Sequence, residues 1–329
     1  MKVTISDVAR LAGVSTATVS HTINNTRYVS DETKERVYQA IRELGYTPDA
    51  SARSFRTGKK QTVGFIVPDI SNKFFGTMIE AVENYLSEHG YHLIIANTKE
   101  DADREETSLR LLTAGLVDGI LVASTMEDFS RFESLIPAGF PVVLVDRTFD
   151  TKRFPSVSVS NFQPIYRSVC RLAGKGDKRI GMIGGLPRLS STKERIAAYQ
   201  EAVADCGLPQ DDLLIRYGNS MENSAQSCLD ELLEQKCDAL VVAQGLMASE
   251  TVIYLHKKGL KLGEDIDLVT FVDYDSDINY LYSKQMDCII QPVEKLGETA
   301  GELILQRIET PDAPAFEQVL TSTYQPCSM

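Results

Sequence analysis

Residues 4–26, TISDVARLAGVSTATVSHTINNT, have the spacing of a helix-turn-helix. Ala9 is small where two helices would cross, Gly13 can adopt the left-handed turn between them, and Val19 can fill the core beneath them. These three residue types at these fixed offsets predict two short helices packed across a tight turn.

Both helices have capping residues at their starts. Thr4 and Asp7 can form a capping pair for the first helix, and Ser15 can accept hydrogen bonds from free N–H groups of the second. A third amphipathic segment has Ser30 as its cap and Gly45 as its stop. The sequence therefore predicts a three-helix head.

The outer face of the second helix carries small and polar side chains. Val14, Val19 and Ile23 would face the core of the head. The opposite face would hold Thr16, Ala17, Ser20 and His21. Methyl groups suit thymine, hydroxyls suit phosphates or base edges, and histidine can donate to guanine. This face predicts a recognition helix for the major groove, the alternative being a helical pair inside a larger core.

Charge is unevenly distributed along the chain. The whole sequence has 34 Lys and Arg against 46 Asp and Glu, a net charge of −12. Residues 1–60 hold ten of the basic residues and six of the acidic ones, which leaves 24 basic and 40 acidic residues for 61–329. A basic head on an acidic body predicts that the head alone contacts nucleic-acid phosphates.

Composition is that of a globular protein with about two domains beyond the head. Of the 329 residues, 43% are hydrophobic and 24% are charged. There is neither a signal peptide nor an apolar run near the roughly 20 residues of a membrane span, so we expect a cytoplasmic protein with no membrane partner. The six cysteines lack C-x-x-C spacing, which argues against a metal site or a disulfide framework. We expect no cofactor.

From residue 61 onward, short apolar runs alternate with amphipathic helical stretches, which is typical of an α/β protein with parallel sheets. The predicted strands are 63–67, 92–96, 119–123 and 142–145 in one series, then 180–183, 213–216, 240–243 and 268–272 in a second. Predicted helices lie near 193–206, 222–235 and 247–259. A late strand at 288–291 precedes a helix at 294–308 and could return the chain to the first of two lobes.

Polar residues follow several of these strands. Ligands bind outside the carboxyl ends of parallel strands, so these positions are candidates for a binding site. They are residues 69–72, Asp146, Arg147, Gln244, Asp273 and Gln291, with Phe74 and Phe75 beginning the first helix of the body. Carboxylates, an arginine and amides around aromatic faces suit a sugar. Unrelated surface charges and core phenylalanines are the alternative.

Nothing comparable points to an enzyme. The glycine-rich run 181–185, GMIGG, lacks the G-x-G-x-x-G spacing of a dinucleotide loop, and no Ser-His-Asp set is evident. The sequence therefore predicts a binding protein without catalytic residues.

Several motifs together identify a family. They are DVAR at 7–10, GVS at 13–15, TVS at 18–20, Asn24, GYTP at 45–48, ARS at 52–54 and PDISN at 68–72. With them the whole sequence resembles the lactose-repressor/galactose-repressor family of transcription factors. Within that family, residues 15–21 resemble the recognition helix of the purine and ribose repressors.

This resemblance implies a homodimer that binds palindromic operator DNA. Residues 50–56 would form a hinge helix in the minor groove, where Phe55 replaces the usual leucine wedge. The DNA-binding residues we expect are Thr4, Ser15, Thr16, Ala17, Ser20, His21, Asn24, Arg53 and Phe55.

The resemblance also implies an α/β fold with a helix-turn-helix head and a two-lobed body like that of the periplasmic sugar-binding proteins. We expect the head at 1–47, the hinge at 48–60 and the effector-binding and dimerisation domain at 61–329. The first lobe would hold about 61–160 and 291–329, and the second about 161–290. No leucine heptads follow the body, so a dimer is expected, with helix faces at 74–86 and 109–116 either in its interface or in the core.

By position, the resemblance implies an effector site between the lobes. Its expected residues are Ser71, Phe74, Phe75, Asp146, Arg147, Ser191, Arg195, Gln244, Asp273 and Gln291. Two acids usual in the family are absent, since Gly245 and Ser160 stand in their places. We expect a repressor controlled by a small molecule, most simply a sugar or sugar derivative. The alternatives are control by a protein partner or by a purine co-repressor.

Overall fold

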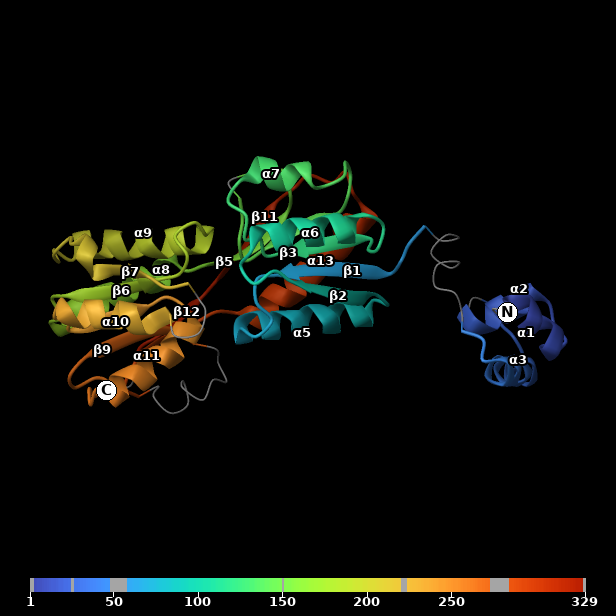
Figure 1. Cartoon of the computed structure of the whole chain (residues 1–329), viewed down its shortest axis with the longest axis horizontal. Coiled ribbons are helices and arrows are strands. Elements are labelled where there is room, and N and C mark those ends of the chain that lie inside the picture. Colours follow the sequence, from blue (N-terminus) through green and yellow to red (C-terminus); the bar gives the residue numbers. More distant parts are fainter. Residues whose placement is uncertain are drawn as a thin grey trace. The chain divides into compact units, whose positions relative to one another are not determined.

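The structure is a computed structural model that describes residues 3–24, 27–47, 58–149, 151–219, 224–272 and 284–327. It divides into two compact units, Met1–Lys60 and Gln61–Met329. Figure 1 labels their helices and strands.

The first unit is the predicted three-helix head. Its helices are α1 (Ile5–Ala12), α2 (Thr16–Asn24) and α3 (Asp31–Leu44). The buried residues between them are Val8, Ala9, Ala12, Val19, Val37 and Ala40. Gly13 has a φ of 65° at the turn, which a residue with a Cβ rarely adopts. Val14 and Ile23 pack against this core, so the predicted inner face is confirmed.

The predicted caps are also confirmed. The Thr4 amide and hydroxyl both donate to Asp7 Oδ2, at 3.0 and 2.7 Å. The Thr18 amide donates to Ser15 Oγ at 3.1 Å, and Ser30 Oγ accepts from the Thr33 amide. Side-chain acceptors therefore satisfy the first free N–H groups of α2 and α3.

The body contains two six-stranded sheets with helices on both faces (Figure 1). The first sheet has the order β11-β5-β4-β3-β1-β2, and all its pairs are parallel. Its strands are β1 (Thr62–Val67), β2 (His92–Asn97), β3 (Gly119–Val122), β4 (Val142–Val145), β5 (Ser156–Ser160) and β11 (Glu317–Thr321). Helices α5 (Lys73–Glu88) and α13 (Val293–Glu309) cover one face, and α6 (Ala102–Thr113) and α7 (Phe129–Ser134) cover the other.

The second sheet has the order β12-β10-β9-β8-β6-β7 and is parallel except for β12. Its strands are β6 (Ile180–Gly184), β7 (Ile215–Tyr217), β8 (Ala239–Val242), β9 (Asp267–Val272), β10 (Asp287–Ile290) and β12 (Thr323–Gln325). Helices α8 (Phe162–Lys175) and α9 (Ser190–Asp205) cover one face, and α10 (Ser224–Glu234) and α11 (Gly245–Lys257) cover the other.

The α/β fold with two parallel-sheet lobes is confirmed, and the structure corrects two details. Residues 213–216 are only partly a strand, because a 3₁₀ turn at Asp212–Leu214 precedes β7. The late strand β10 pairs with β9 in the second sheet, in agreement with the expected bounds of about 161–290 for the second lobe. Residues 291–329 are not all in the first lobe, since β12 pairs with β10.

Three segments of the chain cross from one lobe to the other, and one side chain connects these three crossings. Asn161 follows β5, Gln291 follows β10, and Ser322 lies between β11 and β12. Asn161 Oδ1 accepts from Gln291 Nε2 at 3.2 Å and from Ser322 Oγ at 2.8 Å. The three crossings are therefore held together by hydrogen bonds at the hinge between the lobes.

Close packing of α13 on α5 gives a stability prediction. A Cβ on Gly297 would lie 2.7 Å from both Ala81 Cβ and the Met78 carbonyl oxygen. We expect Gly297→Ala to destabilise the body by about 1 to 3 kcal/mol, because the backbone of α5 at Met78 cannot easily move to make room for the added methyl group. Gly174→Ala is the matched control. Apart from its chain neighbours and its own helix backbone, no atom lies within 4 Å of the new Cβ, and helix propensity favours alanine. Equal chemical-denaturation midpoints for the two variants would contradict this account of the packing.

Candidate functional site

The exposed face of α2 is the candidate DNA-binding surface. Thr16 and Ala17 are exposed and Ser20, His21 and Asn24 are half-buried. Asn24 Nδ2 donates to the Ser20 carbonyl at 2.8 Å, which holds the amide against the helix. Thr4 and Ser15 act as the caps already described. Arg53 and Phe55, together with the rest of the expected hinge helix, lie outside the described residues.

The body contains a cavity of about 660 Å³ between its two lobes. Its lining residues follow strands of both sheets, as expected for ligand sites of parallel sheets. Nine predicted effector residues line it: Ser71, Phe74, Phe75, Asp146, Arg147, Ser191, Arg195, Gln244 and Gln291. The tenth, Asp273, lies outside the described residues. The structure therefore brings together residues that are up to 220 positions apart in the sequence.

Arg195 projects from α9 into this cavity. Its guanidinium carbon lies 4.3 Å from the centre of the Phe271 ring, and Nη1 donates to the Ala243 carbonyl at 2.6 Å. Its Nε has no partner among the described residues. Burial lowers the pKa of Arg195, although the neighbouring Asp146 carboxylate opposes that shift. The guanidinium is thus a buried donor with hydrogen-bonding capacity left for a ligand.

Asp146 lies at the end of β4 in a left-handed conformation with φ of 64°. Burial raises its pKa, while the positive charges of Arg147 and Arg195 act in the opposite direction. A non-glycine residue keeps this conformation only where its surroundings enforce it. Asp146 Oδ2 lies 3.9 Å from Arg147 Nε, so the cavity has a largely buried carboxyl group beside this arginine.

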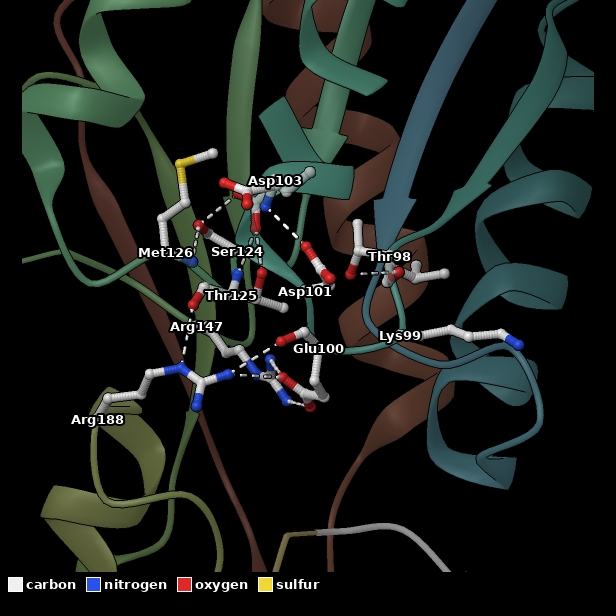
Figure 2. A network of polar contacts seen from close by, with 12 residues as sticks. Thr98, Lys99, Glu100, Asp101, Asp103, Ser124, Thr125, Met126, Arg147 and Arg188 are labelled. Carbon is white, nitrogen blue, oxygen red and sulfur yellow. Dashed lines mark hydrogen bonds and ion pairs between the residues drawn. The ribbon is translucent and has the colours of Figure 1, made fainter. Parts of the chain in front are cut away.

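Arg147 faces a carboxylate that the sequence analysis did not identify (Figure 2). Glu100, after β2, accepts from Arg147 Nη1 at 2.9 Å and from Nη2 at 2.6 Å. The same guanidinium lies 5.8 Å from the Phe75 ring centre. Glu100 could have been found by applying the strand-end rule to the predicted strand 92–96, as it was applied to the strand before Asp146.

Aromatic rings line part of the same cavity. The Phe74 and Phe75 rings meet edge to face at 5.1 Å, and Phe271 at the end of β9 is a third ring that the sequence analysis missed. Polar contacts lie beside them: the Ser71 amide and hydroxyl both donate to Asp69 Oδ1. The cavity therefore combines apolar faces with convergent donors and acceptors, the usual composition of a small-molecule site.

At Ser160, where the sequence lacks the acid that is usual in the family, a carboxylate from α9 lies within hydrogen-bonding distance. Ser160 Oγ donates to Glu194 Oε1 at 2.9 Å, and the Asn161 and Phe162 amides donate to the same oxygen. The Glu194 carboxylate of α9 thus accepts hydrogen bonds from the end of β5 and from the start of α8.

Comparison with known proteins agrees with this architecture. Residues 60–328 match the family of periplasmic binding proteins and the sugar binding domain of the LacI family, and residues 4–49 match the bacterial regulatory proteins of the lacI family. The chain belongs to the LacI family. It is a DNA-binding transcriptional regulator with an effector-binding body.

Individual LacI relatives cover nearly the whole chain. The "HTH-type transcriptional repressor PurR" of Aliivibrio salmonicida is 33% identical over 310 residues, 93% of this chain and 92% of that protein. A CelR transcriptional regulator in complex with cellobiose has a TM-score of 0.72 at 27% identity, covering 98% of each chain. The Lac repressor dimer bound to operator has a TM-score of 0.85 at 22% identity, covering 99% of this chain and 98% of that one, and shows the shared fold.

These matches confirm the predicted family and regulatory function. The curated relatives are transcriptional repressors, which agrees with the prediction of a regulator rather than an enzyme. In the part of the chain that the structure describes, no helix combines the length and apolar character needed to span a membrane.

Proposed function

We propose that this LacI-family regulator is a repressor whose affinity for a palindromic operator is changed by a sugar or sugar derivative bound between the lobes. The observation that carries this proposal is the cavity of about 660 Å³, lined from both lobes by two buried arginines, a largely buried carboxyl group, amides and phenylalanine rings. Because operator DNA is chromosomal, the protein would act in the cytoplasm.

The chemistry of the cavity favours a polyhydroxylated ligand. Vicinal hydroxyls need several donors and acceptors at once, and Arg195, Asp146 and Gln291 supply them. The C–H face of a sugar ring can pack on the phenylalanines. One solved relative carries a sugar, because the CelR regulator is in complex with cellobiose.

A purine is the second candidate. The curated relatives at 31 to 33% identity are named as PurR repressors, and Phe74, Phe75 and Phe271 could stack on a planar base. The same cavity would then hold a co-repressor that strengthens operator binding.

The hydrogen bonds among the three crossings between the lobes can couple ligand binding to DNA binding. Gln291 lines the cavity and donates to Asn161, which also binds Ser322. A ligand that engages Gln291 would favour one arrangement of the three crossings, and hence one relative position of the lobes. Coupling of this kind is typically worth about 1 to 3 kcal/mol, a fivefold to 150-fold change in operator affinity.

A second copy of the chain would complete the DNA-binding form. On the predicted face at 74–86, Phe75, Met78, Val82 and Leu86 are core residues. Exposed apolar side chains lie on β2, at Ile94 and Ile95, and within the other predicted face at 109–116, at Leu111 and Leu116. We therefore place the dimer contact of the first lobe on this surface, at the edge of its sheet.

The experiment that tests the proposal is operator binding with a panel of small molecules. The operator would first be selected from random DNA with the purified protein, and its affinity would then be measured with pentoses, hexoses, their phosphates and purines. A tenfold or larger shift with one sugar would support the main proposal, and a shift with a purine base would favour the second candidate. Tight operator binding that none of them changes would indicate control by a protein partner.

His21 gives a prediction for the recognition helix. We expect His21→Ala to weaken binding to the selected operator by about 1 to 3 kcal/mol and to relax the base preference at one position of each half-site. His256→Ala, on an exposed position of α11, is the control of the same residue type. An unchanged base preference in repeated selection would show that His21 does not read a base.

A further inference from the structure

The two terminal nitrogens of Arg147 in the cavity are already bound by a carboxylate of the chain itself, whereas its Nε has no hydrogen-bond partner among the described residues. The Glu100 carboxylate accepts a hydrogen bond from each terminal nitrogen of Arg147, at 2.9 and 2.6 Å. This is the bidentate contact that arginine makes with carboxylate or phosphate. The two side chains are only 8% and 10% exposed. Figure 2 shows the carboxylate and the guanidinium pointing toward each other. An acidic group of a ligand would therefore find this position taken.

The backbone holds Glu100 in this place despite strain. Lys99 and Glu100 have φ values of 54° and 58°, two consecutive non-glycine residues in the left-handed region. Both ends of the turn are anchored: the Thr98 amide donates to the Val67 carbonyl, and Asp101 caps α6. Strained residues of this kind persist only where surrounding contacts enforce them, and they concentrate at functional sites.

The second lobe also fixes Glu100. Arg188, in the loop between β6 and α9, donates from Nη2 to the Glu100 carbonyl at 3.1 Å and from Nε to the Thr125 carbonyl at 3.3 Å. Thr125 is itself held by the buried Glu105 carboxylate, which accepts from its amide and its hydroxyl. Contacts from both lobes thus fix the position of Glu100, whose carboxylate binds Arg147.

Carboxylates and guanidinium groups of the chain already pair with each other at this place. Glu100 contacts Arg147 and lies 3.8 Å from Arg188 Nη2, and Asp146 Oδ2 lies 3.9 Å from Arg147 Nε. A phosphate or carboxylate on the ligand would add a negative charge beside Glu100, in a setting where charges are poorly screened. An uncharged ligand would leave these ion pairs intact.

We propose that Glu100 is a specificity-determining residue: by occupying Arg147, it makes the cavity select uncharged ligands and reject their phosphate esters and acids. This inference rests on the proposed effector site and adds the charge class of its ligand. Loss of the carboxylate in Glu100→Gln should free Arg147 for an anion.

The test compares anion binding by the full-length wild type and Glu100→Gln. Thermal unfolding would be followed in sodium phosphate, sulfate and chloride at equal ionic strength. Calorimetry would then compare glucose with glucose 6-phosphate and ribose with ribose 5-phosphate. We expect no phosphate-specific stabilisation of the wild type. We expect at least a tenfold gain in affinity for phosphate or a sugar phosphate in Glu100→Gln.

Two variants locate the effect. Glu133→Gln makes the same change in net charge at an exposed pair with Arg153 and should behave as the wild type. Adding Arg147→Met to Glu100→Gln should abolish the gained anion binding while avoiding an unpaired buried charge.

The outcomes separate this inference from the proposed function. Wild-type preference for a sugar phosphate, phosphate-specific stabilisation of the wild type, or no anion gain in Glu100→Gln would each overturn the role of Glu100. If Glu100→Gln does not fold, the wild-type measurements decide alone. If no sugar binds either protein but Glu100→Gln gains phosphate, the sugar effector is wrong and the assignment of Glu100 stands.

Discussion

Arg195→Met should abolish the response to effector while leaving ligand-free operator binding close to that of the wild type. We expect effector affinity to fall by about two orders of magnitude, because a buried arginine makes charge-assisted hydrogen bonds worth about 1.5 to 3 kcal/mol each. The measurements are calorimetry with the effector found in the panel and operator binding with and without it.

Among the cavity residues, we expect Arg195 to have the largest effect on effector affinity because of its position. Arg195 is 7% exposed, packs on Phe271 and has an unpartnered Nε among the described residues. Methionine retains most of the apolar contact with Phe271 and removes every donor. The loss would therefore report hydrogen bonding to the ligand rather than the filling of space.

Stability needs its own control, because Asp146 would lose a nearby positive charge. Arg195→Met combined with Asp146→Asn removes both charges, and we expect it to recover stability without recovering effector binding. Arg195→Lys retains charge but loses the planar fork and should have an intermediate effect. Wild-type effector affinity in Arg195→Met would exclude Arg195 from the site.

The strand-end rule explains why so much of the cavity could be predicted. Asp146 and Gln291 lie one residue after the end of a strand, and Arg147 and Gln244 lie two residues after it. Parallel topology brings such ends together. Glu100 lies four residues after the predicted strand 92–96. Lys99 and Glu100 are both left-handed, so the rule identifies Glu100 only when the whole turn after the strand is included. Glu194 was missed for another reason, since its contact with Ser160 spans 34 positions.

The strands that were missed have weak local patterns. Residues 156–160, SVSVS, alternate in polarity, which is typical of a half-exposed strand, yet β5 is largely buried between β4 and β11. β12 has only three residues, and its position depends on pairing with β10, which precedes it by more than 30 residues in the sequence. By contrast, β1 and β8 are almost wholly buried in the structure, and their continuous apolar runs predicted them well.

Two aspartate substitutions in α2 should abolish operator binding for different reasons. Val19→Asp should unfold the head, whereas Thr16→Asp should leave it folded and remove affinity by charge alone. For both we expect operator affinity to fall more than a hundredfold, measured by fluorescence anisotropy with the selected operator.

Val19 is fully buried among six core residues of a small unit. Stability of a domain is of the order of 0.1 kcal/mol per residue, so this head has only a few kcal/mol to lose. An unpaired buried carboxylate costs about that much or more. We therefore expect the head of Val19→Asp to be digested by protease at concentrations that leave the wild-type head intact, while the body survives.

Thr16 is exposed at the first position of α2. A carboxylate there interacts favourably with the helix dipole, which typically contributes 0.3 to 1 kcal/mol, so the head should be as resistant to protease as the wild type. The same charge would face the DNA phosphates if this face enters the major groove. Retained operator binding by Thr16→Asp would therefore exclude this face of α2 from the interface, even if Val19→Asp behaves as expected, because loss of the folded head does not reveal which surface meets DNA.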